Sequence, residues 1–217
     1  MKIGVFGTGN VGETIGSKLV ALGHDVMMGS RSATHEKALA FVAKHGGKAK
    51  AGTFEEAAEF GEILFNCTLG NASIEVLKQA GNANLAGKIL IDVSNPLDFS
   101  NGMPPGLSLC NTTSLAEEIQ ATFPELKVVK SLNTMWCGLM VNPGLIGGGD
   151  HDVFMSGNDA GAKETVKRLL MSFGWGEKNI LDLGDVSTAR GTEMYLPLWL
   201  RIWGATKTGA FNLKIVR

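Results

Sequence analysis

Residues 2–12 read Lys2-Ile3-Gly4-Val5-Phe6-Gly7-Thr8-Gly9-Asn10-Val11-Gly12, an apolar strand followed by a glycine-rich turn. A helical pattern continues over residues 13–22, and a second strand follows near Val26. Strand, Gly-x-Gly-x-x-Gly turn and helix in this order are typical of the first βαβ unit of a dinucleotide-binding fold. There Gly7 permits the tight turn, Gly9 leaves room for a pyrophosphate, and Gly12 lets helix and strand pack closely. The stretch predicts a dinucleotide whose phosphates lie at a helix N-terminus, where free N–H groups favour an anion.

The composition is that of one globular domain. The chain has 217 residues, 44% of them hydrophobic and 19% charged, with a formal net charge of -1. This argues against a nucleic-acid surface and against a disordered tail. The longest apolar run, Met194 to Trp203, falls short of the ~20 residues that span a bilayer, and no signal region precedes the first strand. We therefore expect a cytoplasmic protein with no membrane segment.

The three cysteines match neither a metal site nor a disulfide framework. Cys67 lies in an apolar strand pattern and is interpreted as a small core residue. Cys137 follows a predicted strand at the edge where ligands bind. We expect reduced thiols and no metal.

The remaining periodicity predicts a doubly wound, mostly parallel Rossmann-type sheet over residues 1–183, followed by a C-terminal helical extension over residues 184–217. Predicted strands cover residues 24–28, 48–51, 62–68, 88–93, 127–132, 153–156 and 179–183, and predicted helices cover 34–44, 53–60, 73–80, 115–122 and 160–173. Thr53 with Glu56 indicates a capping box, and Ser114 indicates another helix start. Residues 97–113 show no period and are expected to form a long loop, a candidate for substrate contact.

The end of the second strand indicates which dinucleotide is bound. An NAD enzyme usually places a carboxylate about 20 residues beyond the glycines, on the adenosine ribose. This chain has Ser30-Arg31-Ser32 instead. A guanidinium between two hydroxyls suits a 2′-phosphate, so NADP(H) is predicted. Thr8 and His35 could complete the phosphate site; the alternative is an ordinary solvated loop.

Ligands of open α/β sheets bind outside the carboxyl ends of the strands. The segments that follow three further strands are therefore expected to line the cofactor. The predicted cofactor-binding residues are Gly7, Thr8, Gly9, Asn10, Val11, Gly12, Ser30, Arg31, Ser32, His35, Thr68, Leu69, Gly70, Ser94, Asn95, Pro96, Asn133, Thr134 and Cys137. No catalytic residue is assigned, and the reactants are expected to be positioned by Asn133, Thr134, Met135 and Cys137.

No acid or base is found at these strand ends. None of the four histidines falls there, and the one tyrosine, Tyr195, belongs to the C-terminal extension. Hydride transfer to a flavin-like ring needs stacking of two rings, whereas a carbonyl or imine needs a proton donor. A flavin-like small-molecule acceptor is therefore favoured. A reductase of a small imine or carbonyl and a non-catalytic NADPH-binding sensor stay as alternatives.

Tyr195, Trp199 and Trp203 recur at a spacing of four and would share one helical face. Such a face either packs on its own domain or forms a homodimer interface, and a homodimer is expected.

Together these stretches resemble the NADPH-dependent coenzyme F420 reductase family, in a bacterial-type member. The resemblance is carried by Gly7 to Gly12, Gly29-Ser30-Arg31, Lys130-Ser131-Leu132-Asn133-Thr134-Met135, Leu183-Gly184-Asp185 and Ala189-Arg190-Gly191. It implies hydride transfer between NADP and a deazaflavin, with FMN or FAD as related acceptors. It also implies that Thr8, Ser30, Arg31 and His35 bind the phosphate and that residues 133–137 line the acceptor site. Archaeal members carry His in place of Asn133 and Pro in place of Trp136. The same domain occurs in membrane-bound metalloreductases.

Overall fold

The computed structural model describes residues 1–216 of the chain. The strands are β1 (Lys2–Phe6), β2 (Asp25–Ser30), β3 (Ala49–Thr53), β4 (Ile63–Asn66), β5 (Ile89–Asp92), β6 (Leu97–Asp98), β7 (Gly106–Leu107), β8 (Lys127–Ser131), β9 (Val153–Gly157) and β10 (Ile180–Asp182). The α-helices are α1 (Asn10–Ala21), α2 (Glu36–His45), α3 (Phe54–Phe60), α4 (Gly70–Ala80), α5 (Asn82–Leu85), α6 (Leu115–Thr122), α7 (Cys137–Val141), α8 (Ala160–Phe173), α9 (Ala189–Met194) and α10 (Leu196–Thr206).

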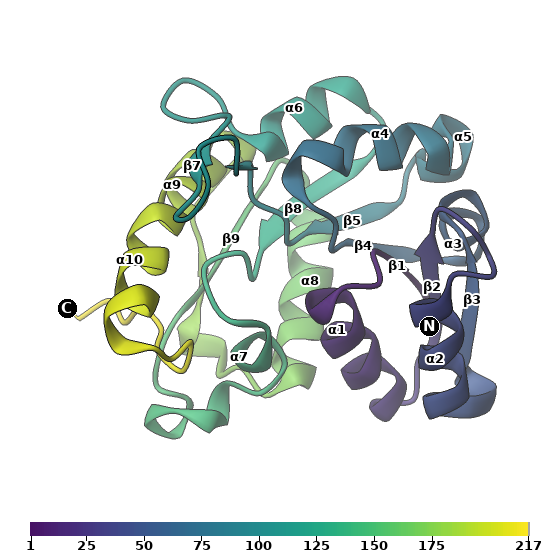
Figure 1. Ribbon diagram of the computed structural model, residues 1–217, viewed down its shortest axis with the longest axis horizontal. Coiled ribbons are helices and arrows are strands. Elements are labelled where there is room, and N and C mark those ends of the chain that lie inside the picture. Colours follow the sequence, from purple (N-terminus) through teal and green to yellow (C-terminus); the bar gives the residue numbers. More distant parts are fainter. Residues whose placement is uncertain (217) are drawn as a thin grey trace.

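Eight strands form one sheet in the order β10-β9-β8-β5-β4-β1-β2-β3 (Figure 1). Neighbouring strands are parallel except β8 and β9, which pair antiparallel with Lys130 opposite Ser156. The chain winds outward from β1 to β3 and then in the other direction from β4. This arrangement confirms the predicted Rossmann-type sheet, and its switch point lies between β1 and β4.

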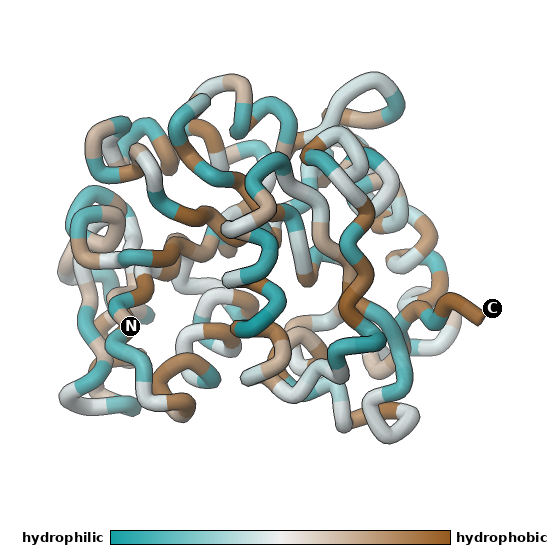
Figure 2. Tube along the Cα trace, turned by 180° about the vertical axis from the view of Figure 1, so that it is seen from behind, coloured by the Kyte–Doolittle hydropathy of each residue, from teal (hydrophilic) through white to brown (hydrophobic). Residues whose placement is uncertain are grey.

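Helices cover both faces of the sheet, so the strands are apolar on both sides. In β4, Phe65 packs into the cluster on the face of α1, α2, α7 and α8, and Leu64 packs into the cluster on the face of α3, α4, α5 and α6. Ile91 and Leu90 of β5 divide in the same way. Several of the hydrophobic stretches in Figure 2 accordingly cross the interior.

Local signals placed most helix starts well. Thr53 and Glu56 form the predicted capping box at α3, and Ser114 accepts from the Glu117 N–H at α6. One start was wrong: α4 begins at Gly70, three residues before Ser73. A Cβ on Gly70 would lie 2.1 Å from the Asn95 carbonyl oxygen, so this glycine allows the helix to begin against the loop after β5.

The loop prediction for residues 97–113 was also incomplete. β6 and β7 form a short antiparallel hairpin within it, with Leu97 opposite Leu107. Strands of two residues are too short to show a period in the sequence.

The C-terminal arm, residues 184–216, is only partly helical. Its helices α9 and α10 are separated at Tyr195, two residues before Pro197, which has no N–H to continue the helical ladder. Beyond α10 the chain is irregular and returns to the start of β9, where the Asp152 N–H donates to the Leu213 carbonyl at 2.9 Å. Arg217, the last residue of the predicted extension, lies outside the described residues. Within residues 1–216 no helix is long and apolar enough to cross a bilayer.

Candidate cofactor site

The three glycines of the first turn meet different surroundings. Gly7 has a φ of +107°, and a Cβ on it would lie 2.7 Å from the Cys67 carbonyl oxygen. A Cβ on Gly12 would lie 2.0 Å from the Gly7 carbonyl oxygen. A Cβ on Gly9 would meet nothing within 4 Å. The fold therefore needs glycine at positions 7 and 12, whereas Gly9 borders open space.

The helix that starts at this turn has no capping side chain among residues 1–216. Gly9 is the N-cap of α1, and no side chain of residues 1–216 caps this helix. Leu69 is the N-cap of α4, also without a capping side chain in the described chain. The first N–H groups of such helices have no partner within the helix and, with the helix dipole, favour a phosphate.

The turn after β2 presents a cation that no carboxylate neutralises. Arg31 is exposed, and among residues 1–216 it takes part in no salt bridge. The Ser30 hydroxyl is buried and donates to the Ser32 carbonyl at 2.7 Å. His35 N-caps α2 by accepting the Lys37 N–H through Nδ1 at 3.2 Å, so in its neutral form the proton is on Nε2. His35 thus has a structural role and still has one N–H to donate.

The loops after β5 and β8 are fastened to each other. The Asn95 Nδ2 donates to the Asn133 carbonyl and the Asn133 Nδ2 donates to the Asn95 Oδ1, each at 2.9 Å. Leu132, between β8 and this contact, is buried at a φ of +65°, a conformation that leucine rarely adopts. Backbone strain of this kind is often held at functional sites. Thr134 and Met135 follow it and are buried.

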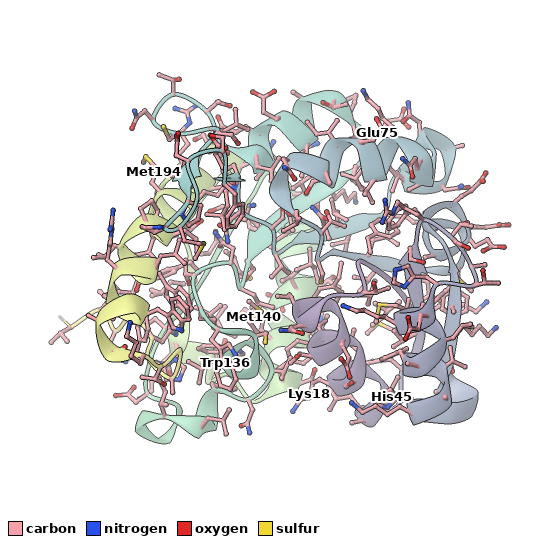
Figure 3. The ribbon with its side chains drawn as sticks, in the orientation of Figure 1. Lys18, His45, Glu75, Trp136, Met140 and Met194 are labelled. Atoms are coloured by element: carbon pink, nitrogen blue, oxygen red, sulfur yellow. The ribbon has the colours of Figure 1, made fainter. Side chains whose placement is uncertain are left out.

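Trp136 marks the far end of this segment. Its side chain lies beside α7 (Figure 3), and the residue is 44% exposed. A Cβ on Gly138 would lie 2.4 Å from the Trp136 ring, and a Cβ on Gly209 of the C-terminal arm would lie 3.0 Å from the Trp136 Cβ. The indole therefore lies between α7 and the arm. Cys137, the first residue of α7, is half-buried.

A buried cluster of charged side chains lies beneath these loops, and it was not predicted from the sequence. The Lys130 Nζ lies 2.5 Å from Asp92 Oδ2 and 2.7 Å from Glu193 Oε1, with all three side chains at most 2% exposed. The available signal was a lysine inside an apolar strand, since a buried lysine needs a carboxylate partner.

Two of the four histidines are hydrogen-bonded to other parts of the protein. His45 bonds to Ser17 at the end of α2, and His151 is buried against the Pro143 carbonyl. Burial lowers the pKa of His45. The Tyr195 hydroxyl is buried without a partner among residues 1–216, and burial raises its pKa. Burial likewise raises the pKa of Cys67, which agrees with its reading as a core residue.

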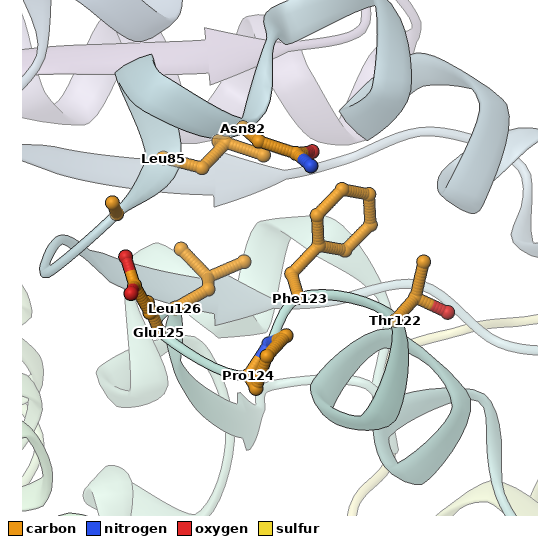
Figure 4. A pocket seen from close by; sticks show the side chains of 8 residues that line it. Asn82, Leu85, Thr122, Phe123, Pro124, Glu125 and Leu126 are labelled. Carbon is orange, nitrogen blue, oxygen red and sulfur yellow. The ribbon is translucent and has the colours of Figure 1, made fainter.

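The pocket shown in Figure 4 is not this site. It has a volume of about 280 Å³ and is lined by Asn82, Leu85, Ala86, Thr122, Phe123, Pro124, Glu125 and Leu126. These residues come from α5 and the turn before β5 and from the turn between α6 and β8, where β5 and β8 begin, whereas the predicted cofactor residues follow the ends of the strands.

Comparison with known proteins shows the family to which the chain is similar. The family of coenzyme F420-dependent NADP oxidoreductases matches residues 2–96. A crystal structure from Arthrobacter sp. FB24, of a protein assigned as an F420-dependent NADP reductase, is 51% identical, covers 100% of both chains and has a TM-score of 0.94.

More distant similarities are to a metalloreductase and to a reductive aminase. The metalloreductase STEAP3 of Rattus norvegicus is 29% identical over 204 residues, which are 91% of this chain but 38% of that protein. A reductive aminase of Aspergillus terreus in complex with NADPH and ethyl levulinate is 19% identical, with a TM-score of 0.66 over 95% of this chain and 62% of that one. At this identity it shares the fold alone.

The fold, the open glycine turn and the full-length likeness at 51% identity lead to one assignment. The protein is an NADP-dependent oxidoreductase, and the chain belongs to the family of F420-dependent NADP oxidoreductases.

Proposed function

We propose that the protein transfers hydride between NADPH and a flavin-like acceptor, either the deazaflavin coenzyme F420 or FMN or FAD. The observation that carries the proposal is the chemistry of residues 133–137, which are Asn, Thr, Met, Trp and Cys. None of them is a histidine, aspartate, glutamate, lysine or tyrosine, the side chains that most often serve as general acids. A flavin-like ring needs stacking at near-attack distance, whereas a carbonyl needs a proton donor.

The cofactor would lie along the carboxyl edge of the sheet. In this proposal the pyrophosphate lies at Gly9 and the start of α1, and the 2′-phosphate at Arg31 with Thr8, Ser30, Ser32 and His35. The remaining predicted contacts follow β4, β5 and β8: Thr68, Leu69, Gly70, Asn95, Pro96, Asn133, Thr134, Met135 and Cys137. Ser94 is predicted in the same set, but its hydroxyl donates to Asp92 at 2.6 Å, which suits it to holding the loop.

Trp136 would form one wall of the acceptor site. It follows the proposed nicotinamide contacts directly, and its indole is held between Gly138 and Gly209. An aromatic ring fixed in this way offers a surface on which a flat acceptor can stack.

The test is stopped-flow oxidation of NADPH with separate acceptors. Coenzyme F420, FMN, FAD, a ketone panel and a cyclic imine are each mixed with enzyme and NADPH, and the absorbance of NADPH is followed. Rapid oxidation by a flavin-like acceptor alone is expected. Turnover of the ketones or imines instead would favour the alternative, a small imine or carbonyl reductase. Tight NADPH binding with no oxidation by any acceptor would contradict the proposal.

A homodimer through α10 is also proposed. The aromatic stripe is divided: Trp199 stacks on Phe211 of the same chain at 5.3 Å, whereas Trp203 is 43% exposed. Leu198 and Met103 nearby are 56% and 64% exposed, which is unusual for large apolar side chains. Light scattering of the eluting protein is expected to give twice the chain mass, and Leu198→Glu to give the monomer. A wild-type monomer at micromolar concentration would contradict the dimer.

A further inference from the structure

A continuous series of buried polar side chains joins the loops that follow β4 and β5. The Thr68 hydroxyl donates to Asn66 Oδ1 at 2.6 Å, and the Asn66 Nδ2 donates to Asp92 Oδ1 at 2.9 Å. The Ser94 hydroxyl and N–H donate to the same Asp92 oxygen, at 2.6 and 3.2 Å. Asn66, Asp92 and Ser94 are at most 4% exposed. Thr68 and Ser94 belong to the segments proposed to line the cofactor, so this network sets where those segments lie.

Lys130 connects this network to the rest of the molecule. Its Nζ donates to the Ser94 carbonyl at 2.8 Å and pairs with Asp92 and Glu193. The Ser94 carbonyl accepts a hydrogen bond from the ammonium, and the two carboxylates form ion pairs with it. Burial alone would lower the pKa of Lys130, but the two carboxylates outweigh it and raise the pKa. The ammonium is therefore charged and held in one position, with the Ser94 carbonyl held against it.

Glu193 brings the C-terminal arm into the same cluster. Its Oε1 pairs with the Lys130 ammonium and accepts a hydrogen bond from the Ala116 N–H at 3.1 Å, and its Oε2 accepts from the Leu115 N–H at 2.7 Å. The carboxylate thus lies at the N-terminus of α6, where the helix dipole favours it. One side chain of the arm holds both the start of α6 and the lysine beneath the cofactor loops.

We infer that Lys130 and Glu193 are positioning residues for the nicotinamide half of the cofactor, and that they couple the C-terminal arm to the crevice. The inference rests on the proposed cofactor site. Lys130 fixes the Ser94 carbonyl, and the next residue, Asn95, exchanges two hydrogen bonds with Asn133. Neutralising Glu193 removes one of the two charges that hold the ammonium, so the ammonium and the Ser94 loop lose their fixed position. The adenosine half lies on β1 and β2, which the cluster does not touch.

The test compares two ligands on two variants. Adenosine 2′,5′-bisphosphate carries the adenosine half and the 2′-phosphate without nicotinamide, whereas NADPH carries both halves. Glu193→Gln keeps the shape of the side chain and removes its charge. Glu117→Gln is the matched control, because Glu117 also joins α6 to the arm, through Arg190, and does not contact Lys130. Affinities are measured by calorimetry, and the fluorescence of bound NADPH reports the surroundings of the nicotinamide ring.

Glu193→Gln is expected to bind adenosine 2′,5′-bisphosphate within about twofold of wild type and NADPH about tenfold more weakly, a coupling typical of packed polar networks. The fluorescence of bound NADPH should shift toward that of free NADPH. Glu117→Gln should match wild type with both ligands. Glu193→Asp keeps the charge on a side chain that is one methylene shorter. It should bind NADPH more tightly than Glu193→Gln and more weakly than wild type.

Unchanged NADPH affinity and fluorescence in Glu193→Gln would overturn the inference, and so would an equal loss for both ligands, since that indicates a general structural role. If Glu193→Gln does not fold, Glu193→Asp is measured against the same two ligands and judged by the same criterion. Failure of the wild-type protein to bind either ligand would instead overturn the proposed cofactor site, so the two failures are distinguishable.

Discussion

Gly9 and Gly12 belong to one turn, but Gly9 is proposed to leave room for the cofactor whereas Gly12 allows close packing of strand and helix. Substituting alanine at each position should distinguish these two roles. Gly9 has a φ of −79°, which alanine adopts freely, and open space around it. Gly9→Ala is expected to change the free energy of unfolding by less than about 0.5 kcal/mol. It should weaken NADPH binding more than tenfold, because the methyl group takes up the phosphate space. Calorimetric titration and urea denaturation measure both quantities.

Gly12→Ala is the contrasting variant. Its methyl group would lie 2.0 Å from the Gly7 carbonyl oxygen, so strand and helix must move apart. A loss of about 1–3 kcal/mol in the free energy of unfolding is expected from such overpacking. A Gly12→Ala protein as stable as wild type, or a Gly9→Ala protein with unchanged affinity, would refute this division of roles.

Arg31 is the residue predicted to distinguish NADPH from NADH. Its guanidinium is exposed and has no carboxylate partner in residues 1–216, so a 2′-phosphate would be its main ionic contact. Arg31→Ala should weaken NADPH binding about 10- to 100-fold, the value of charge-assisted hydrogen bonds, and leave NADH within about twofold. Arg31→Lys should fall between the two. Equal losses for both cofactors would rule out the 2′-phosphate assignment.

At the level of elements, a paired arginine and glutamate hold α9 against α6. Arg190 donates from Nε to Glu117 Oε2 at 2.8 Å and from its terminal nitrogen to Oε1 at 2.5 Å. Chiefly these hydrogen bonds hold the pKa of Glu117 below its usual value of 4.5. The pair therefore contributes stability at pH values above about 4.5, and this contribution is lost as the pH falls through the lowered pKa.

Glu117→Gln should accordingly be less stable than wild type at pH 7, and the difference should shrink as the pH approaches 3. Urea midpoints at the two pH values test this. The effect is expected to be small because the Arg190 side chain is 38% exposed. A difference that does not depend on pH would show that the amide is disfavoured for a reason other than charge.

On the scale of the whole molecule, the irregular end of the arm holds α10 in place. Phe211 stacks on Trp199, and Asn212 donates to the Asp152 carbonyl at 2.9 Å. Phe211→Ala removes a half-buried aromatic pair and should cost about 1–2 kcal/mol of unfolding free energy. Val216→Ala, at a residue 87% exposed, is the control and should stay within about 0.5 kcal/mol. Equal melting temperatures for the two variants would mean that the Phe211–Trp199 contact contributes no stability.

The sequence predicted the sheet, the glycine turn and two helix caps because each depends on residues close together in the chain. Strands apolar on both faces indicate a parallel sheet covered by helices, and Thr53 caps α3 by reaching only to the Glu56 N–H. The proposed cofactor residues could be named for the same reason. A parallel sheet places the ends of its strands at one edge, whatever the details of packing.

Tertiary structure alone decided what depends on distant partners. No local sequence pattern predicts three such features: the antiparallel direction of β9, the return of residues 207–216 to Asp152, and the position of Trp136 against Gly209. The clearest case is Lys130, an ordinary lysine in the sequence that is charged inside the protein because Asp92 and Glu193 meet it there. A buried charge is tolerated only where opposite charges and hydrogen bonds converge on it, and such convergence exists only once the chain has folded.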